Sequence, residues 1–166
     1  MRNSIFITAR TSSTRLPNKA IIKIKNKLAI EHLIDRLKYS KEADSIVLCT
    51  TKLKKDDVLC EIAEKKNINF FRGSVKDKLV RWYNAAEKYK VSQFVTADGD
   101  DLFCEPSFID KAFIQFKKDK VDFIQASNII AGTFSYAIKT NALKKVCKIK
   151  DSNDTEFMWV YFTETN

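Results

Sequence analysis

Histidine, glycine and proline are scarce in this 166-residue chain, which has one histidine, three glycines and two prolines. The single histidine and four widely spaced cysteines, none in a C-x-x-C pair, argue against a zinc site or a disulfide framework. No apolar run approaches the ~20 residues of a membrane span. The apolar segment of MRNSIFITARTSS is also shorter than that of a signal peptide. We therefore expect a cytoplasmic protein with no membrane partner.

Arginine is the scarce cation. Only six of the 30 cationic residues are arginines, and the formal charge of +9 comes mainly from lysines spread over expected helix faces. This distribution is typical of a solvated surface, and no basic stripe interleaved with aromatics indicates nucleic acid as a partner. With 45% hydrophobic and 31% charged residues, the composition predicts a globular protein, and the length predicts a single domain over residues 1–166.

Short apolar, β-branched runs alternate with segments of helical period. Strands are expected at 4–9, 45–50, 69–71, 93–97, 122–126 and 136–139, and helices at 28–38, 56–66, 74–90 and 107–118 and from about residues 140 and 155. Ser74, with Asp77 as its capping-box partner, and Ser107 are expected to begin two of these helices. The alternation predicts a three-layer α/β fold with a mostly parallel sheet between helices.

Ligands of such sheets bind at the carboxyl ends of the strands. The loop after the first expected strand, ARTSSTRLPNK (9–19), carries two arginines, a lysine and several hydroxyls, but it is neither a Walker A loop nor a dinucleotide fingerprint. The acidic run DGDD (98–101) follows the fourth strand. By itself it is typical of a polar turn, although its carboxylates also suit Mg²⁺. Cations and carboxylates at one sheet edge are the parts of a phosphoryl-transfer site.

The segment 9–19 resembles the A-R-x-x-S-T-R-L-P-x-K signature of the sugar-activating cytidylyltransferases. These include CMP-3-deoxy-manno-octulosonate synthetase and the spore-coat polysaccharide cytidylyltransferases. FRGSVKDKLVRWYNAA (71–86), GDDLFCEP (99–106) and residues 122–128 are similar to further segments of the polysaccharide group. The resemblance implies a Rossmann-like nucleotidyltransferase fold. It also implies Mg²⁺-dependent transfer of CMP from CTP to a sugar acid or amino sugar, with release of pyrophosphate, for surface polysaccharide synthesis.

The resemblance also assigns residues. The positions that match contacts to the triphosphate are Arg10, Ser13, Arg15 and Lys19. Those that match the segment near the base and ribose are Arg72, Gly73, Ser74 and Asp77. Asp100 matches the metal-binding aspartate, and Asp98 is expected to assist it. Lys19, Arg15 and Asp100 are thereby implied to be catalytic.

Two other functions remain open at this point. A glycosyltransferase on a related nucleotide-sugar fold would use Asp98-Gly99-Asp100 as a D-x-D metal site. The resemblance also implies that family members continue beyond the equivalent of Asn166. The chain is therefore expected to be C-terminally truncated relative to the family, and a truncated, non-catalytic nucleotide-binding relative is the other alternative. A homodimer is compatible with each of these functions.

Overall fold

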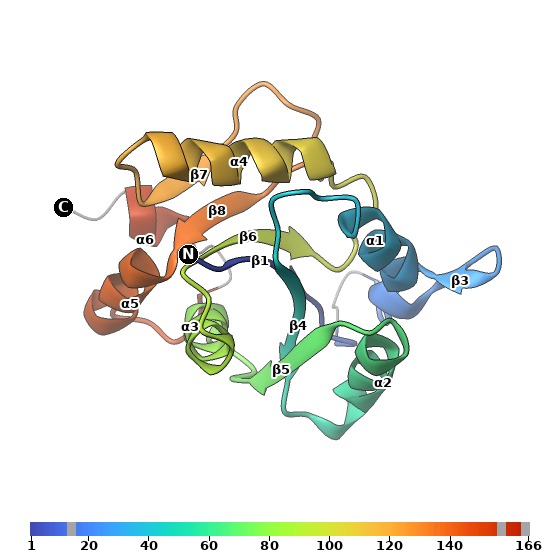
Figure 1. The fold of residues 1–166 in the computed structure, drawn as a ribbon. Helices are drawn as coiled ribbons and strands as arrows, with labels where there is room; N and C mark the ends of the chain where they lie inside the picture. Colours follow the sequence, from blue (N-terminus) through green and yellow to red (C-terminus); the bar gives the residue numbers. More distant parts are fainter. Residues whose placement is uncertain (13–15, 156–158, 164–166) are drawn as a thin grey trace.

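The computed structural model describes residues 1–12, 16–155 and 159–163 (Figure 1). Its central sheet has six strands in the order β5-β4-β1-β6-β8-β7. The strands are β1 (Asn3–Thr8), β4 (Ser45–Thr51), β5 (Asn69–Gly73), β6 (Gln93–Asp98), β7 (Phe123–Gln125) and β8 (Tyr136–Lys139). The first four are mutually parallel, whereas β8 runs antiparallel to both β6 and β7. The predicted α/β fold with a mostly parallel sheet is confirmed.

Helices cover both faces of this sheet (Figure 1). The helices α1 (Ala29–Leu37), α2 (Asp57–Lys65) and α4 (Pro106–Lys118) pack on one face, and α3 (Lys78–Tyr89) and α5 (Thr140–Ile149) pack on the other. Successive side chains of a strand point to opposite faces. In β1, Ile5 and Ile7 accordingly belong to the first core and Phe6 to the second.

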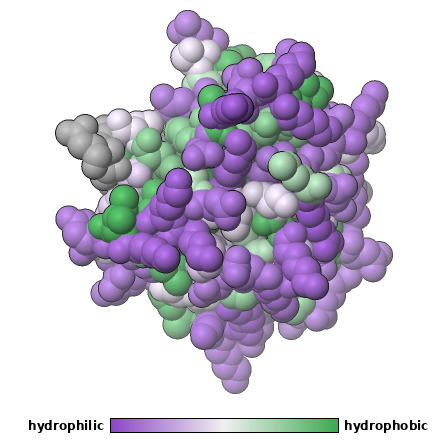
Figure 2. Space-filling model, turned by 60° about the vertical axis from the view of Figure 1, so that its left-hand side comes forward, coloured by the Kyte–Doolittle hydropathy of each residue, from purple (hydrophilic) through white to green (hydrophobic). Residues whose placement is uncertain are grey.

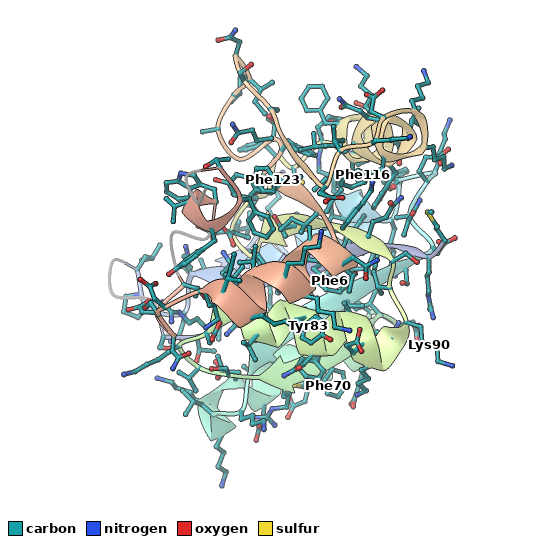
Figure 3. The ribbon with its side chains drawn as sticks, turned by 90° about the vertical axis from the view of Figure 1, so that its left-hand side faces the viewer. Phe6, Phe70, Tyr83, Lys90, Phe116 and Phe123 are labelled. Atoms are coloured by element: carbon teal, nitrogen blue, oxygen red, sulfur yellow. The ribbon has the colours of Figure 1, made fainter. Side chains whose placement is uncertain are left out.

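Aromatic rings dominate the second core. Phe6 stacks on Phe94 of β6 with ring centroids 4.3 Å apart, and Trp82 of α3 meets Phe94 edge-on at 6.0 Å. Figure 3 looks onto this face, where α3 and α5 run side by side over the sheet. The short α6 (Val160–Thr163) adds Phe162, whose ring stacks on Phe123 at 4.9 Å. This packing anchors α3, whose N-terminal end borders the pocket described below.

Two of the predicted helix starts were wrong. Helix α3 is capped by Asp77, whose carboxylate accepts from Val80 N at 3.0 Å, whereas the Ser74 hydroxyl accepts from Asp77 N one turn earlier. Helix α4 begins at Pro106 after the cap Glu105. The fixed φ and missing N–H of proline suit the first helical position, so Ser107 lies inside the helix.

Short elements that the periodicity did not predict connect β1 to α1 and β4 to α2. They are the 3-10 turns η1 (Lys19–Ile21) and η2 (Lys54–Asp56) and the small hairpin of β2 (Lys23–Ile24) and β3 (Lys27–Leu28). The turn η1 follows the first loop and begins with its lysine. That lysine is thus held at the start of an ordered turn.

The surface agrees with the interpretation of the lysines as solvated side chains. Figure 2 shows a face on which hydrophilic side chains predominate and hydrophobic ones form only small, scattered patches. Among the described residues, no helix combines the length and apolar character needed to cross a membrane.

Candidate active site

A pocket of about 410 Å³ opens at the carboxyl ends of β1 and β6. This volume lies within the range of small-molecule sites. The described residues that line it come from the end of β1, the first loop and η1, the β5–α3 connection and the start of α3, the DGDD turn, and the segment after α5. They are Thr8, Ala9, Arg10, Ser12, Lys19, Ala20, Val75, Lys76, Lys78, Arg81, Asp98, Gly99, Asp100 and Asp154. Five are cationic and three are acidic, so the lining carries an excess of positive charge.

Two ion pairs cross this pocket. Lys19 Nζ lies 2.6 Å from Asp100 Oδ2, joining the first loop to the acidic turn. Lys78 Nζ, at the first residue of α3, lies 3.1 Å from Asp98 Oδ1 and 4.9 Å from the centre of the Trp82 ring. The structure thus brings together Lys19, Asp98 and Asp100 as expected from the sequence. It adds Lys78, which the sequence marks only as a lysine near the start of the helix predicted over 74–90.

The first loop is anchored by a buried aspartate. Asp56 is fully buried, and its Oδ1 accepts from the backbone N–H of Thr11 at 2.8 Å and from the Thr11 hydroxyl at 2.7 Å. Its other oxygen accepts from the hydroxyl of Thr51. Burial raises the pKa of Asp56, but these hydrogen bonds outweigh it and hold the pKa below its ordinary value. The loop base beside Arg10 is therefore fixed by a carboxylate of the second βα connection.

The loop is also closed on itself, because Asn18 N donates to Thr11 O at 3.0 Å. Arg10 and Lys19 at its two ends both line the pocket. Ser13 and Arg15, which were also expected to contact the triphosphate, lie outside the described residues. Their contacts with a nucleotide stay a prediction.

Gly99 allows the acidic turn to lie directly against the first loop. A Cβ at this position would stand 2.8 Å from Ala9 Cβ, and Gly99 N donates to Thr8 O at 2.8 Å. Asp101, the last residue of the acidic run, does not line the pocket, and its carboxylate accepts from Asp98 N at 3.1 Å. Burial, followed by the charges of its acidic neighbours, raises the pKa of Asp101 to about 6. Asp101 therefore stabilises the turn that presents Asp98 and Asp100.

The acidic residues of the pocket can be tested as a magnesium site. No group of three or more His, Cys, Asp or Glu side chains with metal-binding geometry occurs among the described residues. Mg²⁺ is commonly held by one or two carboxylates together with waters and substrate phosphates. Asp98 and Asp100 supply such a pair at one strand end, so the donor set fits a magnesium ion that is bound together with a phosphate chain.

The residues of segment 72–77 that were expected to lie near the base and ribose make their main contacts outside the pocket. Arg72 pairs with Asp57 at 2.6 Å and donates to the carbonyl oxygens of Thr51 and Leu53, on the side of α2. Asp77 forms an ion pair of 2.6 Å with Lys150. Neither residue lines the pocket, and the same holds for Gly73 and Ser74. The structure does not bring these four residues to the pocket, and their contact with base and ribose stays a prediction.

From the same segment, the pocket is lined instead by Val75, Lys76, Lys78 and Arg81. Asp154, which follows α5, adds a third carboxylate that sequence reasoning missed. Thr155 beside it donates its hydroxyl to Asp77 and accepts from Leu79 N at 3.2 Å. The segment after α5 is thus tied to the start of α3, and this tie places Asp154 at the pocket.

Known proteins agree with this fold and with the signature of the first loop. The model of a family described as cytidylyltransferase matches residues 4–159. An uncharacterized protein from Methanocaldococcus jannaschii is 36% identical over 159 residues, covering 95% of this chain and 65% of the relative. The spore coat polysaccharide biosynthesis protein SpsF of Bacillus subtilis is 29% identical over 160 residues, covering 93% and 66%. The chain thus spans slightly less than two thirds of the length of these relatives.

Solved structures of other proteins have the same fold. A cytidylyltransferase from Leptospira borgpetersenii superposes with a TM-score of 0.91 at 26% identity, covering 99% of this chain and 72% of that one. CMP:2-keto-3-deoxy-manno-octonic acid synthetase, in complex with CTP, gives a TM-score of 0.73 at 14% identity, covering 99% and 83%, and this likeness concerns the fold alone. The family that the signature in residues 9–19 indicated is confirmed: the chain belongs to the cytidylyltransferase family.

Proposed function

We propose that the protein transfers CMP from CTP to a sugar and releases pyrophosphate. The observation that carries this proposal is the ion pair between Lys19 and Asp100 across the pocket. Each partner is suited to a different part of a nucleotide complex, because a lysine binds phosphate oxygens and an aspartate binds a divalent cation. In the free protein the two side chains neutralise each other. A bound nucleotide would separate them.

The cations of the pocket would do most of the work in this reaction. Lys19 and Arg10, with Arg15, would bind the phosphate chain and stabilise the charge that develops as pyrophosphate leaves. Lys78 stands at the N-terminal end of α3, where the unpaired N–H groups and the helix dipole also favour an anion. An oxygen of the sugar attacks the α-phosphorus in line, so positioning matters more than covalent chemistry.

Magnesium is part of the proposal. Asp100, assisted by Asp98, would hold the ion. The ion would neutralise charge on the phosphate oxygens when it is bound. The protein residues supply the remaining charge neutralisation and the orientation of the nucleotide.

The substrate class is proposed from the relatives. SpsF is named for spore coat polysaccharide biosynthesis, and the signature of the first loop resembles that of enzymes acting on sugar acids. We therefore propose an acidic or amino sugar destined for a surface polysaccharide as the acceptor of CMP.

Calorimetric titration with CTP, UTP, ATP and GTP in the presence of Mg²⁺ tests the nucleotide. CTP should bind most tightly, and equal affinity for ATP would remove the assignment to CTP. Release of pyrophosphate on mixing CTP with a panel of sugar acids and amino sugars tests the transfer. A glycosyltransferase would instead consume an already activated sugar and release no pyrophosphate from CTP.

A further inference from the structure

Arg81 is a buried arginine that no carboxylate of the described residues contacts in an ion pair. Its side chain leaves α3 and passes over Gly73, where a Cβ would stand 2.8 Å from Arg81 Cγ. The residue is 4% exposed and lines the pocket. Its Nη1 donates to the carbonyl oxygen of Ser74, and its buried Nε has no hydrogen-bond partner. Within the described part of the chain, Arg81 forms no ion pair.

The two carboxylates whose charges act on Arg81 are already engaged with other partners. Asp56 and Asp77 both act on the charge of Arg81, but the oxygens of Asp56 accept from Thr11 and Thr51, and Asp77 pairs with Lys150 at 2.6 Å. Burial lowers the pKa of Arg81, and the positive charge of Arg10 lowers it further. A buried cation without an anion is costly. Such a residue is retained at a pocket when a ligand supplies the missing charge.

The chemistry of the pocket identifies the ligand class. Lys19 and Lys78 pair with Asp100 and Asp98, and the lining as a whole carries more cationic than acidic residues. A guanidinium presents a planar fork of donors that fits two oxygens of a phosphate group. We infer that Arg81 is a ligand-binding residue of this pocket, which takes a phosphate oxyanion of the substrate or of the released pyrophosphate. This inference rests on the proposed function for the identity of the phosphate donor.

The closing experiment uses inorganic pyrophosphate as the probe, because its binding requires neither cytosine nor turnover. Titration calorimetry compares the wild-type protein with Arg81→Met and with the control Arg2→Met. Arg2 also donates one guanidinium hydrogen bond to a main-chain carbonyl, that of Tyr89 at 3.0 Å, but it is exposed and follows Met1 at the amino end of β1. Arg81→Met should weaken pyrophosphate binding by about 10-fold or more, the worth of a charge-assisted contact, while Arg2→Met leaves it unchanged.

Thermal unfolding without ligand separates ligand binding from a structural role. Arg81→Met should retain the wild-type melting temperature or exceed it, because it removes an uncompensated buried charge. Equal pyrophosphate affinity of the wild type and Arg81→Met would overturn the inference. A melting temperature of Arg81→Met well below that of Arg2→Met would overturn it too, since Arg81 would then serve the fold through Ser74. Arg81→Lys, which keeps the charge without the fork, should bind pyrophosphate at least about threefold more weakly than the wild type.

The two proposals can fail separately. If pyrophosphate distinguishes Arg81→Met from the wild type but CTP and sugar yield no product, the proposed transfer fails and the oxyanion site stands. If CTP is turned over and pyrophosphate binds both proteins equally, the transfer stands and the role of Arg81 fails.

Discussion

Two lysine–aspartate pairs in this protein have the same length and different surroundings. Lys150 Nζ lies 2.6 Å from Asp77 Oδ2, and Lys19 Nζ lies 2.6 Å from Asp100 Oδ2. The side chains of the first pair are 5% and 7% exposed, whereas those of the second are 29% and 41% exposed. The first pair lies beneath the start of α3, and the second crosses the pocket.

The difference determines what each pair can do. Asp77 also caps α3 through Val80 N and accepts from the hydroxyl of Thr155, so both of its oxygens have partners within the protein. Removing one partner of a buried pair leaves the other charge uncompensated. An exposed pair contributes little to stability, because water competes with each partner. The pocket pair can therefore open for a nucleotide at small cost, which the buried pair cannot do.

The largest effect on stability is expected for Lys150→Met. The substitution leaves Asp77 buried without its cation, so the free energy of unfolding should fall by about 3–5 kcal/mol. Denaturant titration measures it. The matched control is Lys117→Met, which breaks the pair with Glu42 at 2.6 Å, where the side chains are 59% and 29% exposed. Equal losses in the two variants would remove the distinction between the buried pair and a surface pair.

Breaking the pair of Lys19 and Asp100 should affect activity strongly and stability little. Lys19→Ala should lower the rate of CMP transfer by about 10²–10³, the effect of removing one preorganised donor. Its free energy of unfolding should change by no more than about 1 kcal/mol. Lys27→Ala is the control, since Lys27 Nζ also lies 2.6 Å from an aspartate, Asp35, and does not line the pocket. Full activity of the Lys19→Ala variant would show that Lys19 is a solvated surface lysine with no role in catalysis.

Much of the fold could be predicted because its strands are marked locally. The run SIVLCTT became β4, and the two cores on either side of β1 follow from the alternation of its side chains. The helix caps were harder, because Asp77 and Ser74 are both good caps and only the tertiary contacts of Asp77 decide between them. The hairpin of β2 and β3 was missed because its two-residue strands carry little periodicity.

The sequence predicted that residues directly after the strand ends lie together, and it missed the pocket residues that helices and a later segment contribute. Lys19 and Asp100 meet because parallel strands end at the same sheet edge. Arg72 shares a motif with Arg81, but it lies in a strand and extends toward Asp57, while Arg81 lies one turn into a helix and reaches the pocket. Asp154 lies far from both loops in sequence. No local pattern distinguishes these positions.

Another buried carboxylate, that of Asp56, extends the comparison, because it is held by two hydroxyls and a backbone N–H and not by a lysine. In Asp56→Asn an amide NH₂ would face the donors of Thr11 and Thr51, so the free energy of unfolding at pH 7 should fall by about 1–3 kcal/mol. The folded pKa of Asp56 lies below its ordinary value of 3.8. Its contribution is therefore present above that value and is lost as the pH falls through the lower folded pKa.

Denaturant titration of Asp56→Asn and the wild type across pH tests this sign. The difference between the two proteins should be largest near neutral pH and should shrink below about pH 4. Asp57→Asn is the neighbouring control, because Asp57 is 45% exposed and pairs with Arg72. A difference that grows on acidification would contradict the role of the Asp56 carboxylate as an acceptor.

The smallest expected effect is a change in the reactivity of Cys147, whose thiol senses the charges of the buried pair of Lys150 and Asp77. Burial, together with the charge of Asp77, raises the pKa of this thiol to about 11, although the charge of Lys150 opposes the rise. Lys150→Met should therefore shift the alkylation of Cys147 by iodoacetamide to higher pH, because the reactive thiolate becomes rarer. Lys19→Ala should leave it unchanged. Mass spectrometry follows each site, and fully buried Cys49, whose pKa burial raises to about 12, monitors unfolding. Earlier alkylation of Cys147 in Lys150→Met, with Cys49 still protected, would show that Lys150 does not act on this thiol through its charge.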